Sequence, residues 1–189
     1  MPTIVGISGS LRRGSYNTAL LRAAVALTPA GCAIELASIK GIPLYDGDLE
    51  TEEGIPEVVV ALKDLIAAAD GLLLVTPEYN NSIPGTFKNA IDWLSRPGSD
   101  IPRVFGNKPV GLIGATPGGL GTAFSQTAWL AVLRALGTRP YFGHSLYVSG
   151  ASKIFDEQGQ LTDERLRERL RDYLVGFAGF MTSARAVGT

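Results

Sequence analysis

The stretch VGISGSLRRGSYNTALL, from Val5 to Leu21, decides the fold because it joins a strand to a helix through a turn of Gly, Ser and Arg. The β-branched run at 3–8 predicts the strand, and apolar residues at helical spacing predict a helix over 17–27. The same order of strand and helix recurs along the chain. This alternation predicts an α/β fold in which right-handed crossovers build a parallel sheet between two layers of helices.

The other elements are predicted from periodicity and from turn residues. The expected strands lie at 32–39, 71–76, 110–115 and 141–148, and the expected helices begin near Pro56 and at Thr86, Ala123 and Thr162. Thr162 is interpreted as the N-cap of the last helix. The segments 43–54 and 97–107 are predicted to be loops. We see no internal repeat or linker, so residues 1–189 are expected to form a single domain.

Composition and charge exclude several classes of function. The 17 Lys and Arg residues and 18 Asp and Glu residues give a formal net charge of −1, which does not favour nucleic acid or anionic lipid as a partner. No apolar run approaches the roughly 20 residues that a membrane span requires. The beginning of the chain also lacks the pattern of a signal peptide, so we expect a cytoplasmic protein without membrane contact.

The chain has one cysteine, Cys32, and one histidine, His144. These counts exclude a disulfide framework and a zinc site built from Cys or His, and we expect no metal. Cys32 is interpreted as a small buried hydrophobe. A Ser-His-Asp hydrolase is disfavoured because it would depend on His144 alone, and this residue is interpreted as a packed or surface side chain.

Three loops follow strand carboxyl ends, where ligands bind in open parallel sheets. They span 8–17, 76–85 and 115–122. The first loop offers a group of polar side chains, namely Ser8, Ser10, Arg12, Ser15 and Asn17. A helix start adds free N–H groups and about half a positive charge, so the loop is suited to hold a phosphate monoester. A tight turn with a helix cap would use the same Ser and Gly residues, but an Arg and an Asn among three hydroxyls favour an anion site.

The spacing of the glycines narrows the choice of phosphate ligand. Gly6, Gly9 and Gly14 do not fit the dinucleotide fingerprint G-x-G-x-x-G, which disfavours a Rossmann dehydrogenase. Gly9 and Gly14 have the interval of an NTPase loop, but Ser15 and Tyr16 stand where Lys and Ser or Thr are required. The sequence therefore favours a terminal phosphate that is bound but not transferred.

The second and third loops are less specific when each is read alone. The stretch TPEYNNSIPG at 76–85 is rigid at both ends, where Pro77 and Pro84 stand. Its Glu78 is either a buried acid or an ordinary loop carboxylate. The third loop, ATPGGLGT at 115–122, is rich in Gly, so its backbone can approach a ligand closely.

Together these motifs resemble the NADPH-dependent FMN reductases, a flavodoxin-like family that includes chromate and quinone reductases and relatives of the azoreductases. The resemblance rests on GSLRRGSYNTAL at 9–20, PEYNNSIPGTFKNAIDWLSR at 77–96 and GATPGGLGT at 114–122, and it extends over nearly the whole chain. It implies a flavodoxin-like three-layer sandwich around a five-stranded parallel sheet in the order 2-1-3-4-5.

The resemblance also implies FMN as the cofactor and assigns residues to it. Residues of the first loop would hold the phosphate, those of the second would border the isoalloxazine ring, and those of the third would flank it. The candidate cofactor-binding residues are Ser8, Ser10, Arg12, Ser15, Tyr16, Asn17, Pro77, Glu78, Tyr79, Asn80, Thr116, Gly118 and Gly119.

The activity that the resemblance implies is a ping-pong NAD(P)H oxidoreductase. NADPH or NADH would reduce FMN, and two electrons would then pass to quinones, chromate, azo compounds or free flavin. No catalytic side chain is expected because the flavin carries the chemistry. The family forms homodimers or homotetramers, commonly through the helix after the second motif. A flavodoxin-type electron carrier is the main alternative, although such carriers tend to be strongly acidic, and a non-redox regulatory or scaffold domain is another.

Overall fold

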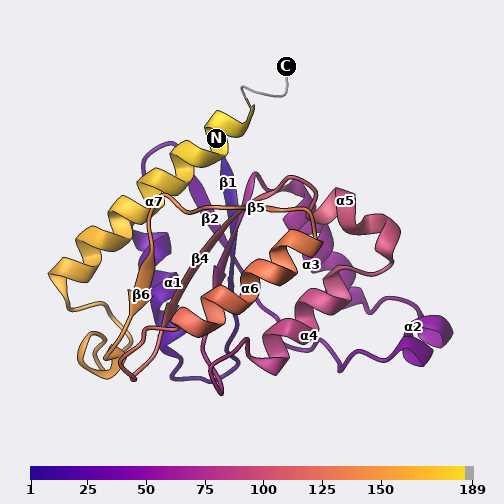
Figure 1. The fold of residues 1–189 in the computed structure, drawn as a ribbon, viewed down its shortest axis with the longest axis horizontal. Helices are drawn as coiled ribbons and strands as arrows, with labels where there is room; N and C mark the ends of the chain where they lie inside the picture. The colour runs from indigo at the N-terminus through magenta and orange to yellow at the C-terminus, as the bar shows by residue number, and fades with distance from the viewer. Residues whose placement is uncertain (186–189) are drawn as a thin grey trace.

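One parallel sheet runs through residues 1–185, the part of the chain that the computed structural model describes (Figure 1). Its strands are β1 (Thr3–Ser8), β2 (Ala33–Ala37), β3 (Gly71–Val75), β4 (Pro109–Ala115), β5 (Arg139–Pro140) and β6 (Leu146–Val148). The order is β2-β1-β3-β4-β5, β6 also pairs with β4, and every pairing is parallel. The predicted α/β class and strand order are confirmed.

Helices cover both faces of this sheet. They are α1 (Tyr16–Ala26), α2 (Gly47–Glu53), α3 (Glu57–Ala68), α4 (Gly85–Leu94), α5 (Ile101–Val104), α6 (Ala123–Ala135) and α7 (Glu164–Arg185), with 3-10 turns at Gly98–Asp100 and Ala151–Lys153. Helices α1 and α7 pack on one face and α3, α4 and α6 on the other (Figure 1). None of the helices in residues 1–185 has the length and apolar character that crossing a membrane requires.

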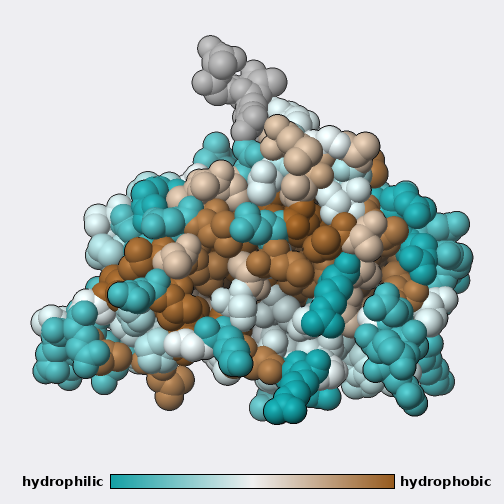
Figure 2. Space-filling view, turned by 180° about the vertical axis from the view of Figure 1, so that it is seen from behind, coloured by the Kyte–Doolittle hydropathy of each residue, from teal (hydrophilic) through white to brown (hydrophobic). Residues whose placement is uncertain are grey.

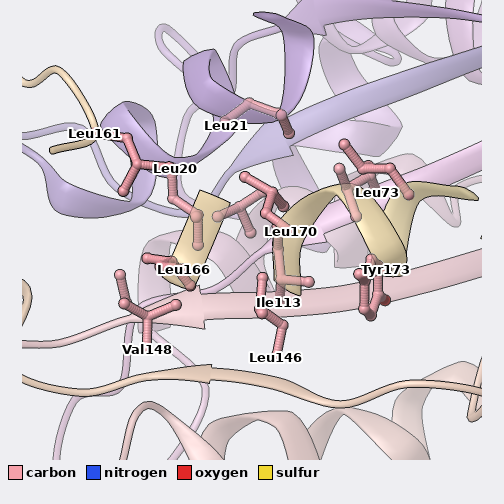
Figure 3. Packing of buried hydrophobic residues seen from close by; sticks show 14 of the residues in the cluster. Leu20, Leu21, Leu73, Ile113, Leu146, Val148, Leu161, Leu166, Leu170 and Tyr173 are labelled. Carbon is pink, nitrogen blue, oxygen red and sulfur yellow. The ribbon is translucent and has the colours of Figure 1, made fainter. Parts of the chain in front are cut away.

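The central strand β3 explains why both layers of helices are needed. All five of its residues are buried, as its continuous apolar run predicts. Because side chains alternate across a strand, Leu72 and Leu74 pack with α3, α4 and α6, whereas Leu73 packs with α1 and α7. Figure 3 shows Leu73 in the core between the sheet and helices α1 and α7, together with Leu170 and Tyr173 of α7.

The prediction of one strand over 141–148 is wrong in its extent. The chain pairs with β4 twice, as β5 beside Pro109 and Val110 and as β6 beside residues 113–115. Between the two strands the Tyr141 ring packs against Tyr173 of α7, with ring centroids 5.4 Å apart. The Tyr141 N–H still donates to the Val110 carbonyl at 2.8 Å, and pairing with β4 resumes at Leu146, an interruption that a short local pattern does not reveal.

The loops predicted at 43–54 and 97–107 each contain a short helix, so both predictions are wrong in part. Helix α2 begins after Asp46, whose carboxylate caps it, and none of its residues is buried. It therefore has no apolar stripe that periodicity could detect. The segment before α2 is held by hydrogen bonds, such as the one of 2.8 Å from Asn89 Nδ2 to the Pro43 carbonyl.

Two single-residue expectations also need correction. Asp163, not Thr162, caps α7, because its carboxylate accepts a hydrogen bond of 2.6 Å from the Leu166 N–H. The Thr162 hydroxyl donates instead to the Ile154 carbonyl at 2.9 Å. Cys32 is only half buried, since it lies just before the edge strand β2, and this partial burial raises the pKa of its thiol.

Candidate functional site

The loops after β1, β3 and β4 meet at the carboxyl edge of the sheet and enclose a cavity open to solvent. Its volume is about 210 Å³. The lining residues are Ser10, Arg12, Ser15, Tyr16, Asn17, Pro77, Glu78, Tyr79, Ala115, Thr116 and Pro117. Nine of the thirteen candidate residues are among them, so the structure brings the three predicted loops together.

Four candidates do not line this cavity, namely Ser8, Asn80, Gly118 and Gly119. Two lining residues, Ala115 and Pro117, were not singled out from the sequence. Both lie within the third motif, so the signal that could have identified them was present in the quoted stretch. Small and apolar side chains carry no chemistry of their own, and their place in the wall follows only from the fold.

The first loop owes its shape to glycine and to serine hydroxyls. Gly9 donates a hydrogen bond of 2.9 Å to the Val75 carbonyl, and a Cβ atom at Gly9 would lie 2.1 Å from the Phe87 ring. No other residue fits there without displacing that ring. The Ser8 hydroxyl accepts a hydrogen bond of 3.4 Å from the Ser10 N–H. The Ser10 hydroxyl likewise accepts one of 3.4 Å from the Arg12 N–H.

The start of α1 forms one wall of the cavity. Ser15 is the N-cap residue, and its hydroxyl accepts a hydrogen bond of 3.2 Å from the Thr18 N–H. The N–H groups of Tyr16 and Asn17, the first two residues of the helix, have no acceptor within the helix. Free N–H groups and the positive end of the helix dipole therefore lie beside the cavity.

Arg12 is exposed and lines the cavity. Among residues 1–185 its guanidinium has neither a hydrogen-bond acceptor nor an ion-pair partner, and no carboxylate neutralises it. A guanidinium presents several donors in a planar fork that matches phosphate oxygens. The first loop thus offers an uncompensated cation at the rim of the cavity.

Asn17 is arranged differently from the other polar residues of the first loop. It is only 4% exposed, and its Nδ2 donates to the Ala115 carbonyl at 2.9 Å while its Oδ1 accepts from the Ala115 N–H at 2.9 Å. Both ends of the carboxamide are thus engaged with the last residue of β4. Its predicted contact with a phosphate stays a prediction.

The second loop makes a tight turn that keeps its tip away from the cavity. Asn80 and Asn81 both have positive φ, at 50° and 58°, and Tyr79 and Ser82 exchange two backbone hydrogen bonds across them. Two consecutive residues with positive φ are typical of a type I′ turn, which Asn tolerates well. The turn explains why Asn80 lies outside the lining, whereas Tyr79, at 47% exposure, stands at its rim.

Glu78 connects the second loop to α6. Its carboxylate accepts a hydrogen bond of 3.0 Å from the Ser125 N–H in the first turn of that helix. The N-cap residue of α6, Thr122, makes no side-chain cap bond of its own. Glu78 therefore supplies the missing acceptor from a distant part of the chain and places a negative charge at the positive end of the helix dipole.

The third loop is held by its own hydroxyl and by the segment after β6. The Thr116 hydroxyl accepts a hydrogen bond of 3.3 Å from the Gly118 N–H, and the Gly118 carbonyl accepts one of 3.1 Å from the Gly150 N–H. Gly118 and Gly119 are exposed on the outer side of this turn. Of the predicted third-loop residues, only Thr116 faces the cavity.

His144 lies outside this site. Its Nδ1 is 2.7 Å from the Tyr141 hydroxyl, on the exposed segment between β5 and β6. Within residues 1–185 no three His, Cys, Asp or Glu side chains cluster closely enough to hold a metal ion. The cavity itself offers donors, hydroxyls and a free guanidinium, which suit the binding of a phosphorylated ligand.

Known proteins resemble this chain in sequence and in fold. The family described as NADPH-dependent FMN reductase matches residues 2–153. The chain is 45% identical over 171 residues to an NAD(P)H-dependent FMN reductase of Pseudomonas aeruginosa, with 90% of each chain covered. It is 38% identical over 182 residues to a quinone reductase of Escherichia coli, with 94% of each covered.

A solved structure agrees with these sequence matches. The flavoenzyme NAD(P)H:(acceptor) oxidoreductase FerB from Paracoccus denitrificans superimposes with a TM-score of 0.87 at 32% identity, covering 97% of this chain and 99% of that one. The family predicted from the three motifs is thereby confirmed. The chain belongs to the NADPH-dependent FMN reductase family of oxidoreductases.

Proposed function

We propose that the protein is an FMN-dependent NAD(P)H oxidoreductase that transfers two electrons to quinones. The observation that carries this function is the unpaired guanidinium of Arg12 at the rim of a three-loop cavity. The matching relatives include a 2-hydroxy-1,4-benzoquinone reductase of Burkholderia sp., which is 37% identical over 182 residues. Chromate, azo compounds and free flavin complete the proposed range of acceptors.

The residues present fit FMN. Its phosphate requires a cation, neutral donors and free N–H groups, and Arg12, Ser10 and the start of α1 supply all three. A flat heterocycle requires a rigid border of backbone groups, and Pro77 to Tyr79 supply it. We assign the phosphate to the first loop, the edge of the ring to the second, and Thr116 to the remaining side.

When bound, FMN supplies the redox chemistry, which is hydride acceptance from NADPH or NADH and delivery of two electrons to the acceptor. The protein would bind and orient the FMN. Arg12 and the N–H groups at the start of α1 would balance the phosphate charge, and a backbone N–H group of the second loop would stabilise negative charge on the ring. None of the cavity residues is assigned as a proton donor, and Glu78 is already engaged with α6.

The open shape of the site supports a ping-pong order. The cavity is open to solvent, and Tyr79, which lines it, is half exposed. A donor and an acceptor that both need the same exposed face of a ring must occupy it in turn. Parallel lines in double-reciprocal plots at several acceptor concentrations are therefore expected, whereas intersecting lines would contradict this order.

The competing function is that of an electron carrier without its own NAD(P)H oxidation. The formal net charge of −1 offers no strong acidic surface for docking to redox partners. The deciding experiment adds FMN to the purified protein, records the visible spectrum, and follows NADPH and NADH oxidation with benzoquinone, chromate and an azo dye. Turnover with quinone supports the enzyme. Retained flavin without turnover supports the carrier, and a protein that stays colourless overturns both functions.

We also propose that the protein assembles as a homodimer or homotetramer. Figure 2 shows a band of apolar residues across the face seen from behind. The exposed large apolar side chains include Leu36 of the edge strand β2 and Phe124 of α6. Exposed apolar groups of this kind favour burial between subunits. Light scattering after size-exclusion chromatography tests the assembly, and a monomer at micromolar concentration would contradict it.

A further inference from the structure

Asn17 lies in the wall of the cavity, yet its side chain is occupied by the protein itself. A carboxamide carries the same donor and acceptor as a peptide group. Its two hydrogen bonds with the Ala115 backbone therefore have the form of a strand pairing, made by a side chain. Ala115 is 2% exposed, so without Asn17 its N–H and C=O would be buried and unpaired at this edge.

The course of β3 explains why Ala115 needs such a partner. Strand β4 is still paired with β3 at Ile113, whose carbonyl accepts a hydrogen bond of 2.8 Å from the Thr76 N–H. Thr116 bonds on the opposite side, to the Val148 carbonyl at 2.9 Å, so the alternating groups of Ala115 point to the β3 side. On that side β3 ends at Val75, and its register with β4 ends at the pair of Val75 and Ile113, two residues before Ala115.

We propose that Asn17 is a positioning residue of the flavin site, whose carboxamide takes the place of β3 as the partner of Ala115 beyond the end of that strand at Val75. It joins the start of α1 to the end of β4, two positions that are 98 residues apart in the sequence. The bond sets the separation between the first and third loops and closes the cavity between them. This inference rests on the proposed function, and it gives Asn17 a role other than the phosphate contact that the family resemblance implies.

The two roles predict different flavin selectivity, because riboflavin lacks the phosphate of FMN. A residue that sets the distance between loops affects both flavins, whereas a phosphate ligand affects FMN alone. We expect Asn17→Ala to weaken the binding of FMN and riboflavin by the same factor, about tenfold. Arg12→Ala is the matched variant, expected to weaken FMN binding and leave riboflavin binding unchanged. Fluorescence titration of each flavin measures the four affinities beside the wild type.

A control separates local geometry from general stability. Thr28, at the far end of α1, donates to the Ala24 and Val25 carbonyls at 3.1 and 2.8 Å and touches none of the three loops. Thr28→Ala is expected to lower the melting temperature and leave both flavin affinities unchanged. If Asn17→Ala does not fold, Asn17→Ser is measured instead.

The outcomes are distinct from one another. An equal loss for FMN and riboflavin in the Asn17 variant supports the positioning role. A loss for FMN alone makes Asn17 a phosphate ligand and overturns the inference, as do unchanged affinities for both flavins. A wild-type protein that binds neither flavin would overturn the proposed function and the inference with it. This result is seen in the wild type, whereas failure of the inference alone is seen only in the variants.

Discussion

Two cations at opposite edges of the sheet have opposite surroundings. Lys108 precedes β4 at the amino edge, is 8% exposed, and its ammonium donates to the Ile66 and Ala69 carbonyls, each at 2.6 Å. Arg12 follows β1 at the carboxyl edge and is exposed, and its guanidinium has no hydrogen-bond or ion-pair partner in the described part of the chain. The Lys108 charge is bound by backbone carbonyls of the fold, whereas the Arg12 guanidinium is free to meet a ligand.

The difference shows how to separate structural from binding charges. A buried ammonium is costly unless it is hydrogen-bonded, and the last carbonyls of α3 provide both acceptors and the negative end of a helix dipole. Burial nevertheless lowers the pKa of Lys108. Arg12 stays hydrated and pays no such cost, so the fold gains nothing from it. A free cation beside hydroxyls and a helix start is therefore the better indicator of a ligand site.

The largest expected effect comes from removing the buried cation at the amino edge. Lys108→Met is expected to lower the free energy of unfolding by about 3 kcal/mol, because buried carbonyls lose their donor. Urea denaturation followed by circular dichroism measures it. Lys88→Met is the control, since Lys88 forms only a half-exposed pair with Asp92 in α4 and is expected to cost about 0.5 kcal/mol or less. Equal costs for the two lysines would contradict the interpretation, as would a loss of FMN affinity in Lys108→Met.

At the carboxyl edge, the double variant Arg12→Ala with Ser15→Ala tests the phosphate site. FMN affinity is expected to fall about a hundredfold, because a hydrogen bond to a charged group contributes roughly 1.5 to 3 kcal/mol. The protein stays folded and loses about 1 kcal/mol of stability, since Ser15 is a helix cap. Calorimetric titration with FMN measures the affinity.

The control for this experiment is Arg13→Ala, which removes a neighbouring exposed guanidinium outside the lining of the three-loop cavity. It is expected to leave FMN affinity within about twofold of the wild type. Unchanged flavin retention in the double variant would mean that the phosphate is bound elsewhere.

A smaller effect sharpens the comparison with a charge at the carboxyl edge that the fold does use. Glu78→Ala is expected to lower the free energy of unfolding by about 1 kcal/mol, because α6 loses the acceptor for its Ser125 N–H. Glu78→Gln keeps an acceptor oxygen and is expected to restore most of that stability. Thermal unfolding of both variants measures the difference. Equal melting temperatures for the Ala and Gln variants would show that the bond does not contribute.

The smallest expected effect is on the pH dependence of stability, and it concerns a second buried lysine, which forms an ion pair with a carboxylate. Lys63 is paired with Asp100 at 2.6 Å, and Arg103 approaches the same carboxylate at 3.2 Å. The hydrogen bond from Lys63, and then that from Arg103, lowers the pKa of Asp100. Its folded pKa thus lies below the unfolded value of about 3.9, so its contribution is complete above that pH and is lost as the pH falls further.

The variant Asp100→Asn cannot lose this contribution on acidification. Its melting temperature is therefore expected to fall less than that of the wild type between pH 6 and about pH 3. The comparison uses differential scanning calorimetry at low ionic strength, where partly exposed pairs are least screened. Identical pH dependence in the two proteins would show that the pair contributes nothing measurable.

Much of the site was predictable because parallel strands carry their carboxyl ends to the same edge. Given that rule, Ser10, Arg12, Tyr79 and Thr116 could be placed around one cavity from three separate loops. Their roles toward FMN remain predictions. The partners of Asn17 and Glu78 could not be found in this way, since they lie 98 and 47 residues distant. Nothing in a local motif distinguishes an amide that binds a ligand from one that binds the backbone.

The predictions that were wrong share a physical cause. Helix α2 has no buried residue and is tied to Arg96 by an ion pair of Glu50, and Tyr141 between β5 and β6 packs against Tyr173 of α7. Both depend on neighbours that are remote in the sequence. Capping by Asp163 in place of Thr162 shows the same limit at one residue, because the Thr162 hydroxyl is drawn to the Ile154 carbonyl.

Periodicity and turn chemistry alone determined the layered α/β fold and the edge at which a ligand is predicted to bind, because alternating apolar patterns leave few ways to bury a parallel sheet. The three motifs alone also pointed to the family. Only the tertiary structure decided which polar groups are free. The side chains of Asn17 and Glu78 are hydrogen-bonded to backbone groups that would otherwise lack partners. The Arg12 guanidinium meets no such group and lies free at the rim of the cavity.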